Sequence, residues 1–317
     1  MVGNKELQNE IRKIMDHKDV KYVLAYKKGT YGFQTTPFFV SKREEVSQVI
    51  FSPFCLNNLT MYIKNEYAKE KIGIVVKGCD SRSLIQMINE KRIPRDRLFI
   101  IGVSCGGVID PKKRSKRISE PLENVDVVEK DDKFVFTVNG KKQEIPKREI
   151  VFDKCIHCEY PTPLIYDFLV GDKIEPLGKE DYCDVKDFEK NSLTDKWKFW
   201  EQQFDKCIRC YACRNVCPVC YCEKCMAEQL DPQWLRRSVN ISENTVWHII
   251  RAFHLAGRCT SCGECERACP MDIPLMLLNK KVEKDIKELF DYNAGKELDS
   301  KPLLAIFKPD DPEEDIK

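Results

Sequence analysis

The sequence has little histidine, almost no net charge and no long hydrophobic run, and each absence excludes a class of function. Its four histidines do not form the spaced set that a histidine-based metal site needs. With 53 Lys and Arg against 51 Asp and Glu, its formal net charge is +2. This charge argues against nucleic acid as a partner, because phosphate binding needs a concentrated positive surface. No apolar run reaches the ~18 residues of a membrane span.

Nucleotide-binding fingerprints and sorting signals are also missing. Neither a Gly-x-Gly-x-x-Gly motif nor a Gly-Lys-Ser/Thr phosphate loop occurs, which argues against a conventional NAD or NTPase site. Spacing pairs no nucleophile with a base, so we predict no catalytic residue. No charged-then-apolar leader opens the sequence, and we expect a cytoplasmic protein. In that reducing compartment, abundant cysteine indicates metal or redox chemistry rather than disulfides.

Cysteine is what the sequence has in abundance, with 17 in 317 residues. Two runs repeat one spacing, Cys-x2-Cys-x2-Cys-x3-Cys-Pro, which is typical of proteins with two [4Fe–4S] clusters. In this pattern the fourth cysteine of each run binds the other run's cluster. We therefore predict one cluster on Cys207, Cys210, Cys213 and Cys269, and a second on Cys259, Cys262, Cys265 and Cys217. Such clusters are sensitive to oxygen, which favours an anaerobic source.

Two further cysteines follow predicted buried strands. Cys79 comes after the apolar residues 72–76, and Cys105 comes after residues 98–103. The carboxyl ends of parallel strands are where open α/β folds bind ligands, and a helix N-terminus at Cys79 favours the thiolate. Together with Cys155 and Cys158, these residues predict a third [4Fe–4S] cluster. The alternative is one or two buried free thiols and an isolated pair.

Cys220, Cys222 and Cys225 follow the first run closely and need a fourth ligand. Cys183 supplies it in our prediction, giving either a fourth [4Fe–4S] cluster or a tetrahedral zinc site, since both take sulfur ligands. Cys55 is then left over as a buried apolar thiol. His157 is placed to hydrogen-bond a cluster sulfur, or is simply exposed, whereas we expect structural roles for His248 and His254.

The sequence predicts a mixed α/β domain over residues 1–200 and a helical dicluster domain over residues 201–295. The first domain should contain a partly parallel sheet with a β-α-β unit. Its expected helices are residues 7–15, 57–67 and 81–88, and its expected strands are residues 22–26, 33–40, 72–76, 98–103, 134–137 and 143–145. Residues 29–32 and the pair Asn139-Gly140 should form hairpin turns. The basic run 112–117 indicates a solvated loop or a docking patch for an acidic redox partner.

Two helices are expected in the dicluster domain, over residues 245–256 and 273–290. Along the first, apolar residues recur at helical spacing and should share a face that packs beside the clusters: Val246, Ile249, Ile250, Phe253 and Ala256. Gly257 should end this helix. Residues 296–317 should form an extended tail, either ordered against a partner or disordered.

Three stretches of the first domain resemble a known family. They are Gly78-Cys79-Asp80, Gly102-Val103-Ser104-Cys105-Gly106-Gly107, and Cys155-Ile-His-Cys158 followed by residues 166–172. These stretches are similar to the beta subunits of coenzyme F-420 hydrogenases and dehydrogenases, including formate dehydrogenase. The resemblance implies iron–sulfur clusters, often FAD, and electron transfer between a flavin or deazaflavin and a catalytic partner. The C-terminal position of the dicluster module resembles subunits that accompany heterodisulfide-reductase-like flavoproteins.

Three functions remain open from the sequence. The leading hypothesis is a non-catalytic electron-transfer subunit that relays electrons between partners of an oxidoreductase complex, such as a hydrogenase, a formate dehydrogenase or a heterodisulfide-reductase-like flavoprotein. The second is an FAD-containing subunit that acts on a deazaflavin, NAD(P)H or ferredoxin. The third is a zinc-binding interaction module, which the paired cluster runs oppose.

Overall fold

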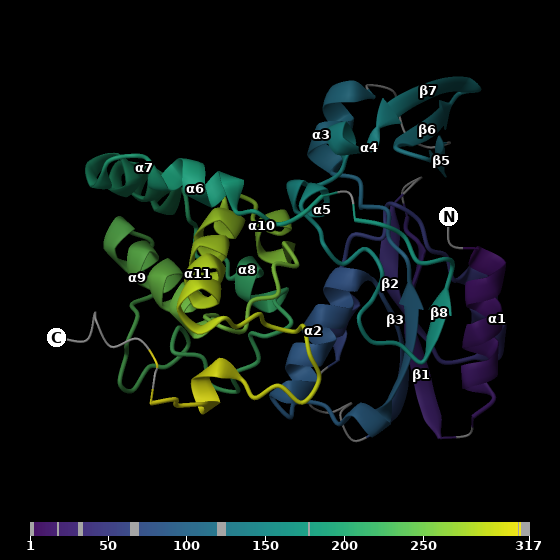
Figure 1. Cartoon of the computed structure of the whole chain (residues 1–317), viewed down its shortest axis with the longest axis horizontal. Helices are drawn as coiled ribbons and strands as arrows, with labels where there is room; N and C mark the ends of the chain where they lie inside the picture. Colours follow the sequence, from purple (N-terminus) through teal and green to yellow (C-terminus); the bar gives the residue numbers. More distant parts are fainter. Residues whose placement is uncertain are drawn as a thin grey trace. The chain divides into compact units, whose positions relative to one another are not determined.

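The computed structural model describes residues 3–17, 19–30, 34–63, 70–118, 125–176, 178–309 and 311. The chain divides into two compact units, Met1–Glu180 and Asp181–Lys317 (Figure 1). The expected boundaries at residues 200 and 295 stay a prediction. Within the described ranges, no helix is both long and apolar enough to cross a membrane.

The first unit is built on a five-stranded sheet with the strand order β2-β1-β3-β4-β8. Only β1 and β2 pair in antiparallel fashion, and the other neighbours are parallel. This mixed, mostly parallel sheet confirms the predicted fold class. The strands are β1 (Val20–Lys28), β2 (Thr35–Val40), β3 (Lys71–Val76), β4 (Leu98–Val103) and β8 (Phe168–Val170).

Helices cover this sheet on both sides, with α1 (Asn4–Met15) and α2 (Gly78–Asn89) lying on opposite faces in Figure 1. Because both faces are covered, β3 and β4 are nearly continuous apolar segments, as buried parallel strands require. Helix α2 connects β3 to its parallel neighbour β4, which confirms the predicted β-α-β unit. This connection places the start of α2 and the end of β4 at the same edge of the sheet.

A separate three-stranded antiparallel sheet contains β5 (Val125–Lys130), β6 (Lys133–Val138) and β7 (Lys141–Pro146). The predicted hairpin of β6 and β7 is confirmed, and its turn residues Asn139 and Gly140 both have positive φ, as a type I′ turn requires. Strand β5 was not expected. Phe134, Phe136 and Ile145 form the core of this small sheet.

Three local expectations in the first unit were wrong or remain incomplete. The basic run belongs to a helix, α3 (Pro111–Arg117), and not to a loop, because Pro111 fits a first helical turn and the Asp110 side chain accepts a hydrogen bond from the Lys112 N–H. The helix expected over residues 57–67 is only the short 3-10 helix η2 (Leu59–Tyr62), and residues 64–67 lie outside the described ranges. Of the expected turn 29–32, residues 31 and 32 also lie outside these ranges.

The remaining short elements connect the larger ones. In the first unit they are η1 (Arg43–Gln48), η4 (Arg95–Arg97), α4 (Lys147–Ile150) and α5 (Asp153–Ile156).

The second unit is helical, which confirms the predicted class of the C-terminal region. Its elements are α6 (Cys183–Glu189), α7 (Leu193–Asp205), α8 (Ala212–Asn215), α9 (Ile241–His254), α10 (Glu264–Arg267), α11 (Leu275–Phe290) and η5 (Leu303–Ala305). The two predicted helices are present as α9 and α11. Helix α9 begins earlier than expected because the Asn240 side chain caps it by accepting a hydrogen bond from the Glu243 N–H.

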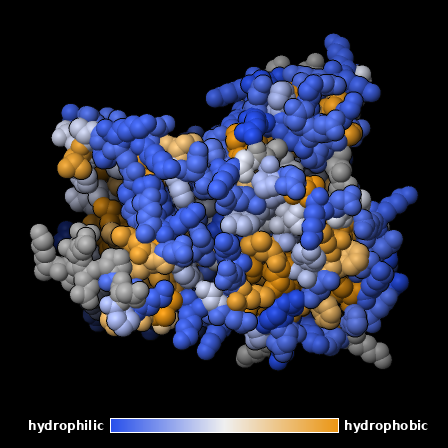
Figure 2. All heavy atoms as spheres, in the orientation of Figure 1, coloured by the Kyte–Doolittle hydropathy of each residue, from blue (hydrophilic) through white to orange (hydrophobic). Residues whose placement is uncertain are grey.

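Helix α9 turns its apolar stripe outward, contrary to the prediction. Val246, Ile249 and Phe253 are exposed, and Phe253 keeps 64% of its surface. The buried residues of the helix are instead Asn244, Trp247, His248, Arg251 and Ala252. Figure 2 shows hydrophobic atoms at the surface on the left, where Figure 1 places α7 and α9. The helix therefore presents a largely polar face to the interior of its own unit.

Part of the expected tail folds back onto the second unit. Gly257, just beyond α9, has a φ of +65° as expected for a residue that ends a helix. A Cβ atom on Gly257 would lie 2.9 Å from the Leu303 Cβ, so Leu303 packs directly against this glycine. Residues 310 and 312–317 lie outside the described ranges.

Candidate iron–sulfur centres

The two cysteine runs have the same local backbone. In the first run Arg209 and Tyr211 have φ values of 54° and 57°, and in the second Ser261 and Gly263 have values of 50° and 71°. A short helix then follows within each run, α8 before Cys217 and α10 before Cys269. Left-handed φ is costly for residues other than glycine. Its repetition at equivalent positions indicates that both loops are shaped for one purpose.

This loop shape directs backbone N–H groups toward cysteine sulfurs. Burial raises the pKa of the Cys207 thiol, and a hydrogen bond from the Arg209 backbone opposes that rise. The same pairing occurs in the second run, where the Ser261 backbone opposes the strong effect of burial on the pKa of Cys259. N–H donors aimed at sulfur stabilise thiolate, which is the form that binds iron.

The structure brings together the four cysteines predicted for the first cluster. Burial raises the pKa of Cys213, and repulsion from the sulfurs of Cys207, Cys269 and Cys210 raises it further. The pKa of Cys207 rises by burial and then by repulsion from Cys269 and Cys210. Cys269 of the second run therefore lies among the first three cysteines of the first run, as the crossed pattern requires.

The four cysteines predicted for the second cluster line a single cavity, with an empty volume of about 320 Å³ that includes the solvent at its mouth. Burial raises the pKa of Cys265 to about 12, and the neighbouring sulfurs of Cys262 and Cys217 contribute to the increase. Four thiols around one buried cavity fit a [4Fe–4S] cluster, which needs four sulfur ligands and little water.

Two polar side chains that sequence reasoning missed also line this cavity. Asn279 of α11 directs its Nδ2 atom to the Cys265 Sγ atom at 3.5 Å. Arg251 of α9 is buried and donates from Nη2 to the Cys213 carbonyl oxygen at 3.0 Å. A sequence signal was available, since Arg251 interrupts the apolar segment of α9 one turn after Trp247.

In the first unit, four cysteines gather at the edge of the sheet. Cys79 lies in the first turn of α2, Cys105 follows β4, and Cys155 and Cys158 lie in and after α5. Burial raises the pKa of Cys105 to about 12, with further repulsion from Cys155 and Cys158. The pKa of Cys79 is also strongly raised, first by burial and then by Asp80, although Cys79 lies at a helix N-terminus. Burial therefore raises the pKa of the free Cys79 thiol more than the helix dipole lowers it.

Close backbone packing holds this edge together. A Cβ atom on Gly78 would lie only 1.5 Å from the carbonyl oxygen of Tyr160, so no larger residue fits there without a shift. The N–H of Cys105 donates to the Pro161 carbonyl oxygen at 2.9 Å. The Val108 N–H points to the Cys155 Sγ atom at 3.5 Å, and the Tyr160 N–H points to the Cys158 Sγ atom at 3.4 Å.

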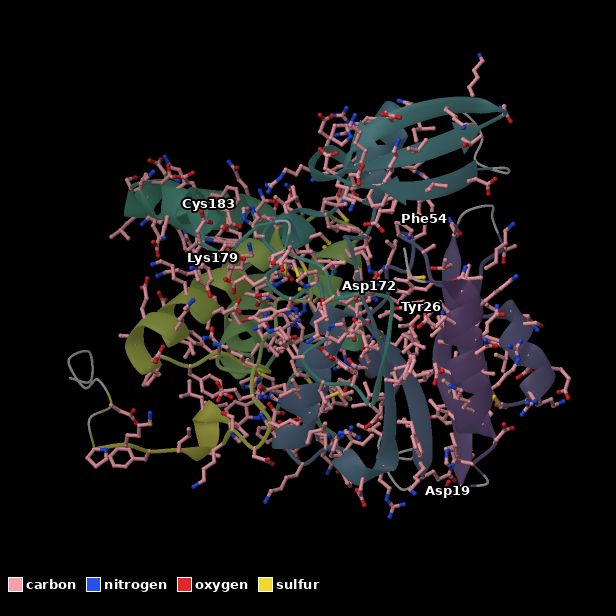
Figure 3. The ribbon with its side chains drawn as sticks, turned by 45° about the vertical axis from the view of Figure 1, so that its right-hand side comes forward. Asp19, Tyr26, Phe54, Asp172, Lys179 and Cys183 are labelled. Atoms are coloured by element: carbon pink, nitrogen blue, oxygen red, sulfur yellow. The ribbon has the colours of Figure 1, made fainter. Side chains whose placement is uncertain are left out.

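A buried charged network lies directly beside Cys79. The Lys77 Nζ atom lies 3.0 Å from an Asp80 carboxylate oxygen and donates to the Tyr26 hydroxyl at 2.5 Å and to the Asn57 carbonyl oxygen at 2.8 Å. Tyr26 is labelled in Figure 3, on strand β1. Lys77 and Asp80 are almost fully buried, and the Lys77 charge lowers the pKa of Cys79, Cys105 and Cys155 against the larger effect of burial.

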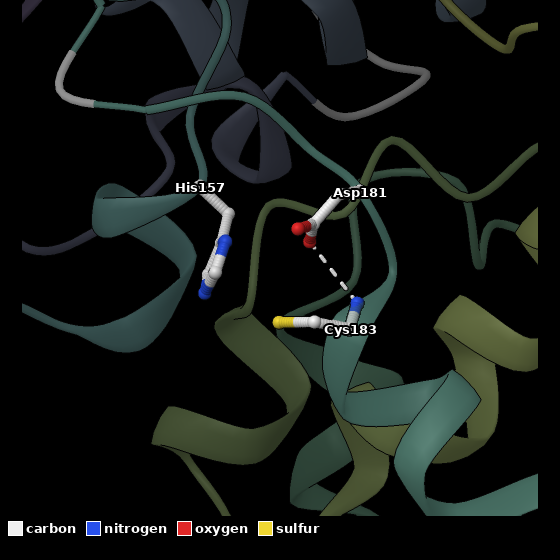
Figure 4. A group of neighbouring side chains, drawn as sticks. All are labelled: His157, Asp181 and Cys183. Carbon is white, nitrogen blue, oxygen red and sulfur yellow. Dashed lines mark hydrogen bonds between the residues drawn. The ribbon is translucent and has the colours of Figure 1, made fainter.

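The last predicted set is not joined by any interaction found among the described residues. Cys183 opens α6, and its N–H donates to an Asp181 carboxylate oxygen at 3.0 Å (Figure 4). Cys220 interacts with Cys217, which lowers the pKa of Cys220. Cys225 lies beside Arg214, and Cys222 is exposed. A site on Cys183, Cys220, Cys222 and Cys225 therefore stays a prediction.

The remaining cysteine and the histidines behave mostly as expected. Cys55 is fully buried, and burial raises the pKa of its thiol. His248 is buried and stacks on Phe204 with ring centroids 4.7 Å apart. Burial, followed by the charges of Arg251 and Arg209, lowers the pKa of His248 to about 3, so this ring is neutral and structural. His254 is exposed at the end of α9, and His157 is partly exposed after α5.

Two models of known protein families match different stretches of the chain. Residues 203–273 match the model of the 4Fe-4S dicluster domain, so the chain is an iron–sulfur protein with at least two clusters. Residues 69–185 match the model for the C-terminal region of the coenzyme F420 hydrogenase/dehydrogenase beta subunit. The chain is therefore similar to the F420 hydrogenase/dehydrogenase beta subunits over this stretch, in agreement with the resemblance of its sequence.

Two curated proteins are similar to this chain over nearly their whole length. The F420-dependent formate dehydrogenase subunit beta of Methanocaldococcus jannaschii is 26% identical over 92% of this chain and 92% of its own. The F420-dependent formate dehydrogenase 1 subunit beta of Methanococcus maripaludis is 26% identical over 92% of this chain and 90% of its own.

A solved structure of the F420-reducing [NiFe] hydrogenase complex from Methanosarcina barkeri contains a chain with weaker similarity. It matches at 15% identity and a TM-score of 0.39, over 52% of this chain and 64% of that chain.

Proposed function

We propose that this protein is the iron–sulfur beta subunit of an F420-dependent hydrogenase or formate dehydrogenase complex, and that it relays electrons between partner subunits. The observation that carries the proposal is the pair of four-cysteine groups in the second unit, in which each run contributes its fourth cysteine to the other run's group. The curated relatives are named as formate dehydrogenase beta subunits, which supports this choice of complex.

A bound [4Fe–4S] cluster supplies one-electron transfer with little change in geometry. The residues of this chain hold and insulate the clusters. The paired loops supply thiolates and N–H donors, while Met276 and Leu255 line the cavity together with the cysteines and limit access of water. This sharing of ligands brings two one-electron carriers close together, which is the arrangement that a relay needs.

We also propose that the chain binds more than two clusters. Cys79, Cys105, Cys155 and Cys158 support a third cluster, because their sulfurs lie close enough to raise one another's pKa at a buried sheet edge. The fourth cluster or zinc site on Cys183, Cys220, Cys222 and Cys225 rests on sequence spacing alone. Binding of FAD is implied only by the family. The cytoplasmic location rests on the cysteine content.

The test is an anaerobic measurement of iron, acid-labile sulfide, zinc and flavin in the purified full chain. Two clusters predict about 8 irons per chain, three predict about 12 and four predict about 16, with matching sulfide. Stoichiometric flavin would favour the FAD-containing alternative over a simple relay. Zinc without labile sulfide would contradict the proposal.

A further inference from the structure

Arg251 is a buried cation that is not a cluster ligand. It lies in the middle of α9, between the two cysteine runs, and only 4% of its surface is exposed. The described part of the chain places no carboxylate within salt-bridge reach of its guanidinium, and its Nε atom has no hydrogen-bond partner there. A buried guanidinium cannot lose its proton, so burial without a counter-charge is strongly unfavourable.

Two other buried cations in the described part of the chain have acidic partners. Lys77 pairs with Asp80 at 3.0 Å, and Lys147 pairs with Glu129 at 2.5 Å. Arg209 is also buried without an acidic partner in that part of the chain, but it donates to the carbonyl oxygens of Glu243 and Arg236 and to the Tyr211 hydroxyl. Arg251 has fewer such neutral partners, because its Nε atom has none and one carbonyl oxygen accepts from its Nη2 atom. Since no carboxylate lies beside it among the described residues, its counter-charge comes from another source.

Cysteine sulfurs surround Arg251 instead. Burial lowers its pKa, but the sulfurs of Cys265, Cys217, Cys213 and Cys220 together raise that pKa above its usual value. Cys213 belongs to the first predicted cluster, whereas Cys265 and Cys217 belong to the second. Arg251 also lines the cavity of the second group and is hydrogen-bonded to the backbone of the first run. It therefore contacts both groups at once.

Given the proposed iron–sulfur function, we propose that Arg251 is a positioning residue whose fixed charge balances both clusters of the second unit and raises their reduction potentials. A cluster with its four thiolates is anionic and gains one more negative charge when it accepts an electron. A nearby cation stabilises the reduced form more than the oxidised form, and the effect is large where water is excluded.

The Arg251 charge should raise the reduction potential of one cluster more than that of the other. The sulfurs that influence Arg251 most are those of Cys265 and Cys217, and both line the same cavity as the arginine. The first group interacts with it through Cys213 and that residue's carbonyl oxygen. Loss of the charge should therefore lower the potential of the Cys217, Cys259, Cys262 and Cys265 cluster more than that of the other.

The test compares three variants of the full chain in anaerobic redox titrations followed by electron paramagnetic resonance. Arg251→Gln removes the charge but keeps an amide donor for the Cys213 carbonyl. Arg251→Lys keeps the charge. Arg237→Gln is the matched control, because it removes the same charge from an exposed position in the same unit.

With Arg251→Gln we expect at least a tenfold fall in the ratio of reduced to oxidised cluster at a fixed potential, which corresponds to about 59 mV for one electron. The second cluster should shift more than the first. Arg251→Lys and Arg237→Gln should stay close to the unmodified protein. Equal potentials in the Gln variant and the unmodified protein would overturn the inference.

Two further outcomes are decisive. If Arg251→Gln loses a cluster, retention of both clusters at normal potentials in Arg251→Lys supports the need for charge, and their loss in Arg251→Lys contradicts it. An unmodified chain without [4Fe–4S] signals would contradict the proposed function itself, whereas intact clusters with unchanged potentials in the variants would contradict only the role of Arg251.

Discussion

At the scale of single residues, the two cysteines followed by proline have the most specific roles. Cys217 belongs to the first run but lines the cavity of the second group, and Cys269 belongs to the second run but lies among the sulfurs of the first. Cysteine spacing alone predicted this exchange, because the motif fixes which ligands one short loop can supply and leaves the fourth position to a distant residue.

Paired substitutions test this exchange of ligands. The double variant Cys217→Ala with Cys265→Ala removes two ligands from one group, so it should lose about four irons per chain. Cys217→Ala with Cys269→Ala removes one ligand from each group and should disturb both clusters. Iron analysis and electron paramagnetic resonance distinguish these results, and the Cys55→Ala variant is the control. Equal damage to both clusters in the first double variant would contradict the assignment.

His248 leads to a prediction about pH. Its pKa of about 3 in the folded protein lies below the ordinary value of about 6.5, so below pH 6.5 the unfolded chain binds a proton that the folded chain does not. The contribution to stability is present above pH 6.5 and is lost as the pH falls from there toward 3, at up to about 1.4 kcal/mol per pH unit.

This contribution can be measured by anaerobic urea unfolding between pH 7.5 and 5.5. The His248→Phe variant should lose less stability over this range than the unmodified protein, because the aromatic contact with Phe204 can persist while the titrating group is gone. The exposed His254 provides the control in a His254→Phe variant. The same pH dependence in the His248→Phe variant and the unmodified protein would show that His248 is not the group responsible.

At the scale of elements, helix α9 is the clearest case in which sequence periodicity misleads. An apolar stripe normally marks the buried face of a helix. Here the interior contains cysteine loops whose backbone and sulfur atoms need polar partners, so Asn244 and Arg251 turn inward while Phe253 turns outward. Asn244 donates to the carbonyl oxygens of Phe204 and Cys207, both at 2.9 Å.

Substitutions on the buried and the exposed face of α9 should have very different effects on the free energy of unfolding. Trp247 is 3% exposed and contacts Tyr211 at a ring-centroid distance of 4.9 Å, so Trp247→Ala should cost about 3–5 kcal/mol of unfolding free energy. Phe253→Ala, on the exposed face, should change the free energy of unfolding by no more than about 0.5 kcal/mol. Urea unfolding of the full chain measures both values. A larger loss for Phe253→Ala would mean that the apolar stripe is buried after all.

The sequence predicted the strands of the five-stranded sheet more completely than those of the three-stranded sheet β5-β6-β7. Strands β3 and β4 are continuous apolar segments, and this pattern is typical of buried parallel strands. Strand β5 was missed because charged residues interrupt its valines, and Val128 remains 52% exposed. Strand β5 is held in place by its pairing with β6, and the sequence of β5 alone does not reveal this pairing.

At the scale of the whole molecule, the two family models match different stretches of one chain, residues 69–185 and 203–273. Cysteine spacing predicted the iron–sulfur class, and the assignment of ligands to each cluster stays a prediction. It did not predict the place of Arg251 or the contact of Lys77 with Tyr26, because these depend on the rotation of α9 and on how β1 lies beside β3.

The central claim is that this chain accepts and transfers electrons through at least two [4Fe–4S] clusters. An anaerobic reductive titration of the purified protein, followed by electron paramagnetic resonance, tests it most directly. We predict uptake of at least two electrons per chain and signals from reduced clusters that interact magnetically, because the two groups share the region around Arg251. Uptake of no electrons, or reduction of a flavin without any cluster signal, would contradict the account.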